Sequence, residues 1–263
     1  MLSERKVYKM KMLAYIHFMR EKSYQKRVLV WDSGVGGLSI VRALVEQKCG
    51  LDIVYYADSE HAPYGDKSVE WLRENVLPCI RQKVEKLSPQ IIVLACNTLT
   101  ASVVGDLRHE YGEDFVVGTE PAIKPATKIN KAILLLATPT TYDNCKILRS
   151  VKKDIELSRI LDVNLASMIE RYYDKPKVLD EYLEKLLCDY KSTDMAVVLG
   201  CTHYVLVRER IQNILGSGVM VLDGTQGVCN RVIRMLGCNN CECSVELIGN
   251  KNVCSVWERY KGA

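Results

Sequence analysis

The chain alternates short aliphatic runs with longer amphipathic segments. Several short runs are apolar at every position rather than at every second one, which is typical of parallel strands covered on both faces. The longer segments, such as 68–87 and 177–190, have helical patterns, and Ser68 is placed to cap the first of them. The predicted strands are 27–32, 52–58, 90–96, 114–120, 132–138, 196–201 and 218–223.

This alternation predicts an α/β fold with mostly parallel central sheets. The chain also resembles itself at long range. A strand ending at Asp32 is followed 64 positions later (96 − 32) by one ending at Cys96, and Thr138 is followed 63 positions later (201 − 138) by Cys201. We therefore expect two similar α/β domains. The carboxyl ends of their strands would face a shared cleft with one thiol on each wall.

The domain boundaries follow from the same pattern. We expect a first α/β domain made of residues 27–119 plus 222–263, and a second made of residues 120–221. Residues 1–26 are rich in Lys and Met and are expected to form a loosely attached extension.

The composition is that of a soluble globular protein. Of the 263 residues 48% are hydrophobic and 26% charged, with a net charge of +4. No Lys/Arg block with interleaved aromatic residues marks a nucleic-acid interface, and no apolar run reaches membrane-spanning length, so we expect neither partner. The eleven cysteines are odd in number and follow no secretory leader, so we expect mostly free thiols in a reducing cytoplasm.

The first candidate site is the segment WDSGVGGLS, residues 31–39, in which a strand runs into a glycine-rich turn. Its glycines do not form the dinucleotide-binding pattern G-x-G-x-x-G, because Ser39 occupies the last position. Backbone N–H groups exposed near a helix start suit a small carboxylate, with Asp32 and Ser33 at the mouth of the turn. Alternatively, Asp32 is only a helix N-cap.

A second candidate is the loop HAPYGDKS, residues 61–68, in which Tyr64 and Gly65 could contact a ligand. Such a segment on its own is more often an ordinary turn.

The two strand-end cysteines are the main candidates for chemistry. Either one alone reads as a small buried hydrophobe, but each is followed by polar groups and a plausible helix start, which lowers a thiol pKa. Burial in a dry cleft acts in the opposite direction. Disulfide redox chemistry would use Cys-x-x-Cys in one turn, and zinc would need more ligands than Cys96, Cys201 and His203 provide. Proton transfer at one carbon from both faces uses the symmetry of the pair, with Asp32 and His203 available to manage the proton.

Three further cysteines lie in the segment CNNCEC, at Cys238, Cys241 and Cys243. A convincing metal site would have a second C-x-x-C pair, which the sequence lacks, so we expect a surface loop with reactive thiols and no metal.

Five separated motifs resemble those of the cofactor-independent glutamate racemases of bacterial cell-wall synthesis, within the aspartate/glutamate racemase superfamily. The motifs are DSGVGGLS (32–39), PYGDKS (63–68), ACNTLTA (95–101), GTEPAIKPA (118–126) and GCTHY (200–204). The resemblance runs from about Arg27 to the region of Asp223. It implies two domains related by pseudo-twofold symmetry, an active site between them, no cofactor, and a cytoplasmic enzyme that supplies D-glutamate for peptidoglycan. We also expect a homodimer.

The resemblance also implies roles for individual residues. Cys96 and Cys201 would be the two catalytic acid/bases, Asp32 would assist Cys96, and His203 would assist Cys201. Glu170, in the looser motif LASMIERYY, would be a further acidic residue near the second thiol. The expected substrate-binding residues are Asp32, Ser33, Tyr64, Gly65, Asn97, Thr98, Thr138, Thr141, Thr202 and His203.

Two positions depart from the family pattern. Thr140, in ATPTT, replaces a glycine, and Val205 follows GCTHY where the family normally has proline. Neither change removes a catalytic group, but both bear on substrate fit. The alternatives are therefore a racemase of the same fold acting on aspartate or another amino acid, a non-catalytic paralogue that binds a small anion or a protein, and a redox-sensing dithiol protein.

Overall fold

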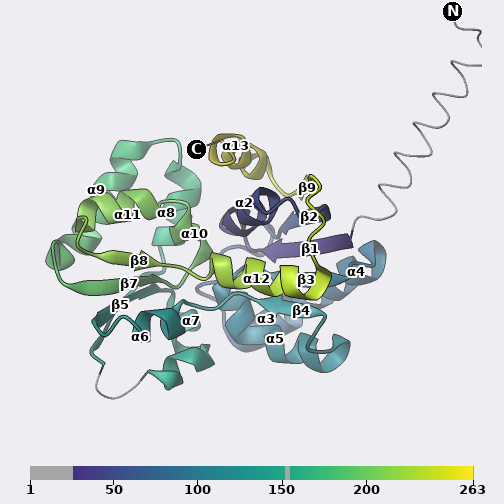
Figure 1. Ribbon diagram of the computed structural model, residues 1–263, viewed down its shortest axis with the longest axis horizontal. Helices are drawn as coiled ribbons and strands as arrows, with labels where there is room; N and C mark the ends of the chain where they lie inside the picture. Colours follow the sequence, from purple (N-terminus) through teal and green to yellow (C-terminus); the bar gives the residue numbers. More distant parts are fainter. Residues whose placement is uncertain (1–25, 152–154, 263) are drawn as a thin grey trace, which may run out of the picture.

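A computed structural model describes residues 26–151 and 155–262 of the chain. The expected extension, residues 1–26, lies outside the described residues except for Lys26. The described chain forms two parallel sheets with helices between and around the strands (Figure 1).

The first sheet has the strand order β4-β3-β1-β2-β9, and every pair of neighbouring strands is parallel. Its strands are β1 (Lys26–Asp32), β2 (Leu51–Ala57), β3 (Ile91–Leu94), β4 (Val116–Gly118) and β9 (Ser244–Ile248). Its helices are α2 (Leu38–Glu46), α3 (Val69–Asn75), α4 (Leu77–Leu87), α5 (Asn97–Tyr111), α12 (Thr225–Leu236) and α13 (Lys251–Tyr260). We call this sheet and these helices the first lobe.

The second sheet has the order β6-β5-β7-β8 and is also parallel throughout. Its strands are β5 (Ala132–Ala137), β6 (Leu157–Leu161), β7 (Met195–Leu199) and β8 (Met220–Leu222). Its helices are α6 (Ile123–Thr127), α7 (Pro139–Asn144), α8 (Leu165–Tyr172), α9 (Pro176–Leu187), α10 (Thr202–Val205) and α11 (Arg208–Leu215), with 3₁₀ turns η1 (Lys146–Ser150) and η2 (Cys188–Tyr190). These elements form the second lobe.

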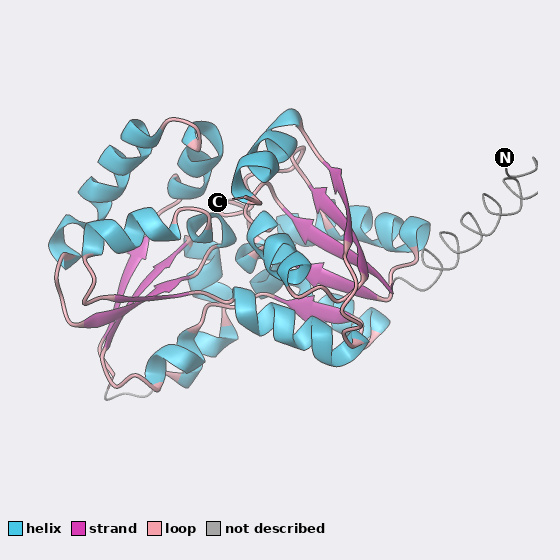
Figure 2. Cartoon of the chain, turned by 45° about the horizontal axis from the view of Figure 1, so that its top comes forward, coloured by secondary structure: helices cyan, strands magenta, loops and turns pink. Residues whose placement is uncertain are grey.

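The two lobes share one strand order. Reading β5, β6, β7 and β8 as counterparts of β1, β2, β3 and β4 reproduces the order of the first sheet, to which β9 adds an edge strand. Figure 2 shows both sheets as separate layers, each flanked by helices. The predicted α/β class is therefore confirmed. The domain boundaries expected at 119/120 and 221/222 stay a prediction.

All seven predicted strands are present, and two further strands, β6 and β9, were not predicted. Both lie at the edge of their sheet, and none of their residues is fully buried. Polar residues such as Arg159 and Glu246 therefore interrupt their apolar pattern. A strand covered on both faces shows a continuous aliphatic run, whereas a partly exposed edge strand does not.

The predicted helix 68–87 is divided into α3 and α4 around Val76. Pro78 lies in the first turn of α4, where its missing N–H is tolerated; inside a continuous helix it would remove a backbone hydrogen bond. The predicted cap is confirmed, because Ser68 Oγ accepts a hydrogen bond from Trp71 N at 3.1 Å.

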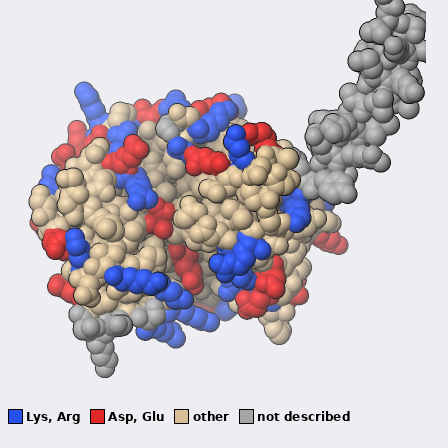
Figure 3. All heavy atoms as spheres, in the orientation of Figure 1, with Lys and Arg blue, Asp and Glu red and all other residues tan. Residues whose placement is uncertain are grey.

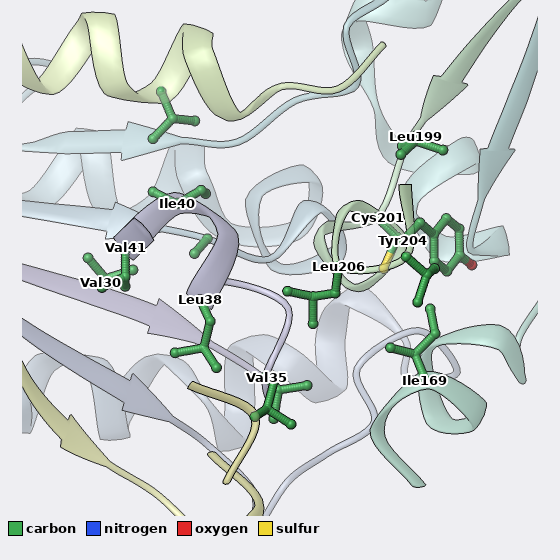
Figure 4. Close-up of a cluster of buried hydrophobic side chains, with 14 of the residues drawn as sticks. Val30, Val35, Leu38, Ile40, Val41, Ile169, Leu199, Cys201, Tyr204 and Leu206 are labelled. Atoms are coloured by element: carbon green, nitrogen blue, oxygen red, sulfur yellow. The ribbon is translucent and has the colours of Figure 1, made fainter. Parts of the chain in front are cut away.

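The largest buried apolar cluster spans both lobes. It contains Val30 and Leu38 of the first lobe together with Leu134 and Val197 of the second. Figure 4 shows members of this cluster from the glycine-rich turn (Val35), α8 (Ile169) and α10 (Tyr204), with Cys201 beside Tyr204. The packing that fixes the position of one lobe against the other thus reaches the candidate site.

No helix in residues 26–151 and 155–262 is both long and apolar enough to cross a membrane. Positive and negative side chains are interspersed over the face shown in Figure 3.

Candidate active site between the lobes

A cavity of about 370 Å³ lies between the two lobes, and both strand-end cysteines line it. Cys96 comes from the first lobe and Cys201 from the second, and each thiol side chain is buried. Both are N-cap residues, of α5 and α10 respectively. Seven other predicted site residues also line the cavity, namely Ser33, Tyr64, Gly65, Thr98, Thr138, Glu170 and His203.

The glycine-rich turn, residues 33–37, brings the lobes into close contact. A Cβ atom added at Gly34 would lie 1.6 Å from Glu170 Oε1, and one at Gly36 would lie 2.5 Å from His203 Nδ1. A side chain at Gly34 would displace the Glu170 carboxylate, and one at Gly36 would push α10 away because it also meets the backbone atom His203 N at 2.6 Å. The turn does bind a carboxylate, as its exposed N–H groups predict, but this carboxylate is the protein's own: Val35 N donates to Glu170 Oε1 at 3.0 Å.

Glu170, His203 and Cys201 form a connected row in the second lobe. His203 Nε2 lies 2.7 Å from Glu170 Oε1, and His203 Nδ1 lies 3.8 Å from Cys201 Sγ. Burial alone would lower the pKa of His203, but the hydrogen bonds to Cys201 and Glu170 outweigh it and hold that pKa well above 6.5. Burial opposes ionisation of Glu170 as well, yet the bond to His203 gives the carboxyl a lowered pKa. This row favours a charged imidazolium beside the Cys201 sulfur.

Cys96 has a different environment. Burial is the largest effect and raises the pKa of its thiol, and the nearby Asp32 and Cys201 add to the rise. The backbone N–H of Leu99 and the Ser33 hydroxyl, 3.9 Å from Cys96 Sγ, act in the opposite direction. The start of α5 therefore lowers the pKa of the Cys96 thiol, as predicted, but burial raises that pKa by more. Cys96 is held as a protonated thiol, whereas Cys201 faces a cation.

Asp32 lies behind the cavity and is fully buried. Its carboxylate accepts hydrogen bonds from Gly34 N at 2.7 Å and, from the second lobe, Thr202 Oγ1 at 3.2 Å. The first bond closes a local turn and does not cap a helix. Burial raises the pKa of Asp32, with His203 acting against the rise. Its effect on Cys96 is electrostatic, and its predicted assistance to that thiol stays a prediction.

Three threonine hydroxyls join the lobes at the cavity wall. Thr98 Oγ1, in the first lobe, lies 3.0 Å from both Thr138 Oγ1 and Thr141 Oγ1, which are 2.9 Å apart in the second lobe. In such a triangle each hydroxyl can donate to one neighbour and accept from the other.

Thr140, which replaces a glycine of the family pattern, makes a contact between the lobes. Its hydroxyl lies 3.1 Å from Gly65 O and 3.2 Å from Lys67 O, so it ties the loop 61–68 of the first lobe to α7 of the second. A glycine at this position would leave the two carbonyls without this partner. Val205, the other departure, lines a separate pocket beside α2 and α12 and does not reach the cavity.

Four predicted binding residues do not line the cavity. Asp32, Thr141 and Thr202 lie behind the wall and act through their hydrogen bonds. Asn97 instead lines a larger groove of about 1000 Å³ elsewhere on the protein, which is rich in charged residues and which neither thiol lines. The expectation that the carboxyl ends of the strands face a shared cleft thus predicts the region of these residues, but not whether they reach the cavity surface.

Several residues that line the cavity were not predicted from the sequence, namely Ser59, Ala62, Pro63, Val163, Ala166, Ser167, Arg171 and Asn252. Asn252 comes from α13, near the end of the chain, and its Nδ2 donates to Glu170 O at 3.0 Å. Ser59 follows β2, so a search for polar residues at strand ends could have found it. Nothing in the sequence marks Asn252, because its position depends on how α13 packs.

The loop that contains Cys238, Cys241 and Cys243 lies against residues 47–51 of the first lobe. Cys238 and Cys241 are exposed, and Cys238 Sγ lies 3.4 Å from Gln47 O. A hydrogen bond from the Cys49 thiol lowers the pKa of Cys238. Among the residues that the structure describes, no group of three or more His, Cys, Asp or Glu is arranged to hold a metal ion.

Known glutamate racemases resemble the chain over most of its length. It is 37% identical to the glutamate racemase of Clostridium acetobutylicum over 213 residues, which are 79% of this chain and 82% of that one. It is 33% identical to that of Clostridium perfringens over 237 residues, 88% of this chain and 91% of that one. No protein-family model matches the chain.

Solved structures give the same result. The Escherichia coli glutamate racemase, determined with L-glutamate and the activator UDP-MurNAc-Ala, superposes with a TM-score of 0.78 at 26% identity, covering 90% of this chain and 95% of that one. An aspartate racemase from Picrophilus torridus shares the fold, with a TM-score of 0.54 at 17% identity over 81% of this chain and 95% of that one. The resemblance inferred from the five motifs is therefore confirmed, and the chain belongs to the glutamate racemase family.

Proposed function

We propose that this protein interconverts L- and D-glutamate by proton transfer at Cα between two cysteines. The observation that carries the proposal is the pair of thiols, one from each lobe, lining a single cavity. Inverting a stereocentre requires one group to remove the proton from one face and another to return a proton to the opposite face. The membership in the glutamate racemase family supports glutamate as the substrate.

The unequal environments of the thiols support an order of events. In the L-to-D direction, Cys201, next to the His203–Glu170 pair, acts as the thiolate base, and Cys96 is the thiol that donates a proton to the other face. The carbanion formed between these steps is costly, because the Cα proton of an amino acid is weakly acidic. Fixed hydrogen-bond donors and exclusion of water would reduce this cost. In the D-to-L direction the two thiols exchange roles.

The residues around the thiols would bind the substrate and support the cavity wall. Ser33, Tyr64, Gly65, Thr98 and Thr138 line the cavity and would hold the ammonium and carboxylate groups of the amino acid. Asp32 and Thr202 would hold the glycine-rich turn and the second lobe in register. Asn97 and Thr141 would support the wall behind them. No step needs a cofactor.

The proposed biological role is to supply D-glutamate for peptidoglycan, in the cytoplasm, by an enzyme that acts as a homodimer. This role rests on the family to which the chain belongs.

Circular dichroism of L-glutamate solutions tests the proposal. The purified protein, without added pyridoxal phosphate, should drive the signal of L-glutamate to zero and act far more slowly on L-aspartate. Cys96→Ser and Cys201→Ser should each lower the rate at least about a thousandfold, because a serine hydroxyl is a much weaker acid and is almost never ionised near neutral pH to act as a base. Cys188→Ser, on the exposed surface, is the matched control and should keep full activity. Wild-type protein that leaves L-glutamate unchanged, or a Cys96→Ser, Cys201→Ser double variant that racemises it normally, would refute the proposal.

A further inference from the structure

Ser59 holds a buried hydroxyl without a partner. Among the side-chain nitrogen and oxygen atoms of the residues that the structure describes, Ser59 Oγ is the buried one that makes no hydrogen bond. Buried polar groups in folded proteins are almost always paired, since leaving one unpaired costs free energy. A small shift of the Ser59 side chain would let such a hydroxyl bond to a ligand group beside it, because Ser59 is one of the residues that line the cavity between the two lobes.

Hydrogen bonds on both sides of Ser59 hold the loop in place. Asp58 N donates to Asp32 O at 2.9 Å, which fixes the loop to the end of β1. The Asp58 carboxylate lies 2.9 Å from His61 Nδ1 and accepts a hydrogen bond from the Tyr64 hydroxyl. Ser59 N donates to Ala57 O at 2.9 Å, so the backbone at Ser59 is held in place while its hydroxyl has no partner among the described residues.

Each of the other buried hydroxyls of the cavity wall is already in a hydrogen bond within the protein, which it would have to exchange in order to donate to a carboxylate. Tyr64 donates to Asp58, and Ser33 donates toward Cys96 Sγ. Thr98 and Thr138 belong to the threonine triangle. A ligand with carboxylate groups would therefore find an uncommitted O–H donor at Ser59, and a hydroxyl–carboxylate bond is among the stronger hydrogen bonds because it is charge-assisted.

We propose that Ser59 is a substrate-binding residue whose hydroxyl donates a hydrogen bond to a carboxylate oxygen of glutamate. The identity of the substrate rests on the proposed function; the position of the donor rests on the geometry alone. Two effects are therefore expected of the Ser59→Ala variant, one on substrate binding and one on stability. Removing the hydroxyl should weaken substrate binding, and it should leave the free protein at least as stable, because an unpaired buried group is lost rather than a bond.

The test compares Ser59→Ala, Ser59→Thr and a matched control, Ser102→Ala. Ser102 is also buried, but its hydroxyl already donates to Thr98 O at 2.8 Å within α5. Calorimetric titration with D-glutamate should show affinity lowered at least about tenfold in Ser59→Ala, the size expected for a hydrogen bond to a charged group. Ser59→Thr should recover most of this loss, and Ser102→Ala should bind D-glutamate within about twofold of wild type. The melting temperature of unliganded Ser59→Ala should equal or exceed that of wild type.

The outcomes are distinguishable. Wild-type protein that neither binds nor racemises glutamate would refute the proposed function and this inference together. Normal racemisation by wild type, with Ser59→Ala binding D-glutamate as tightly, would refute the inference alone and leave the two-thiol proposal intact. A Ser59→Ala protein that loses both affinity and melting temperature would show that the hydroxyl supports the fold, and would also overturn the inference.

Discussion

At the scale of single residues, the two thiols differ because their neighbours differ. Cys201 lies beside His203, whose pKa is raised by its hydrogen bonds to Cys201 and Glu170, whereas the pKa of Cys96 is raised by its burial and by the nearby Asp32. This asymmetry is what a two-base racemase needs at the start of a turnover, when one sulfur must be ionised and the other must carry a proton. It could not be derived from the two similar strand-end motifs alone.

Replacing Glu170 by Gln should change the titration of His203. With the charge and hydrogen bond of Glu170 removed, burial should move the pKa of His203 below its wild-type value. NMR titration of the imidazole would measure this shift. Racemisation should fall at least about tenfold at neutral pH, because the proposed base, Cys201, would lose the positive charge beside its sulfur. An unchanged His203 titration would contradict the proposed role of Glu170.

The same pair makes stability depend on pH with a definite sign. The pKa of His203 is raised in the folded state above its ordinary 6.5, so its contribution is complete below about pH 6.5 and is lost as pH rises through the folded value. The pKa of Glu170 is lowered from 4.5, so its contribution is complete above about pH 4.5 and is lost as pH falls. Urea unfolding should therefore show the largest deficit of Glu170→Gln, about 1–3 kcal/mol, between pH 4.5 and 6.5. A deficit that grew towards alkaline pH would have the wrong sign.

At the scale of elements, the site is built where the glycine-rich turn of the first lobe meets α8 and α10 of the second. The sequence predicts this turn and both cysteine-bearing strand ends, because central parallel strands leave long aliphatic runs. It does not predict the contribution of α13 or the edge strands β6 and β9. Asn252 reaches the cavity only because α13 packs back on the first lobe, and no local pattern records that packing.

Gly36→Ala should inactivate the enzyme while leaving it folded. The added Cβ would lie 2.5 Å from His203 Nδ1 and 2.6 Å from His203 N, and the backbone atom cannot move without moving α10. A displacement of about 1 Å between catalytic groups can cost about a hundredfold in rate, so we expect kcat/KM to fall at least that much. Circular dichroism spectra should stay like those of wild type.

Gly105→Ala is the matched control. Gly105 lies within α5, and nothing lies within 4 Å of an added Cβ there. The substitution should keep activity and raise stability by about 0.5–1 kcal/mol, as expected for glycine replaced in a helix. Equal loss of activity in both variants would argue against the close approach of the lobes at Gly36.

At the scale of the whole molecule, the lobes are not independent. One apolar cluster crosses between them, and the threonine triangle and the Asp32–Thr202 bond link them again beside the cavity. The long-range repeat in the sequence predicts two similar halves, and the shared strand order agrees with it. How tightly the halves are joined is visible only in three dimensions.

The continuous cluster predicts that both lobes unfold together in urea. Trp31, Trp71 and Trp257 all lie in the first lobe, so tryptophan fluorescence reports on that lobe, whereas far-ultraviolet circular dichroism reports on both. The two transitions should coincide. A fluorescence midpoint clearly separated from the circular dichroism midpoint would show that the lobes unfold as separate units.

The central claim is that two sulfurs act on one carbon from opposite faces, and isotope exchange tests it most directly. L-glutamate is incubated with the enzyme in D₂O, and both enantiomers are analysed by mass spectrometry during the first few per cent of turnover. The account predicts one deuterium at Cα of nearly every D-glutamate molecule formed, while the remaining L-glutamate keeps its protium. D-glutamate formed without deuterium, or L-glutamate that gains deuterium as fast as the product, would contradict it.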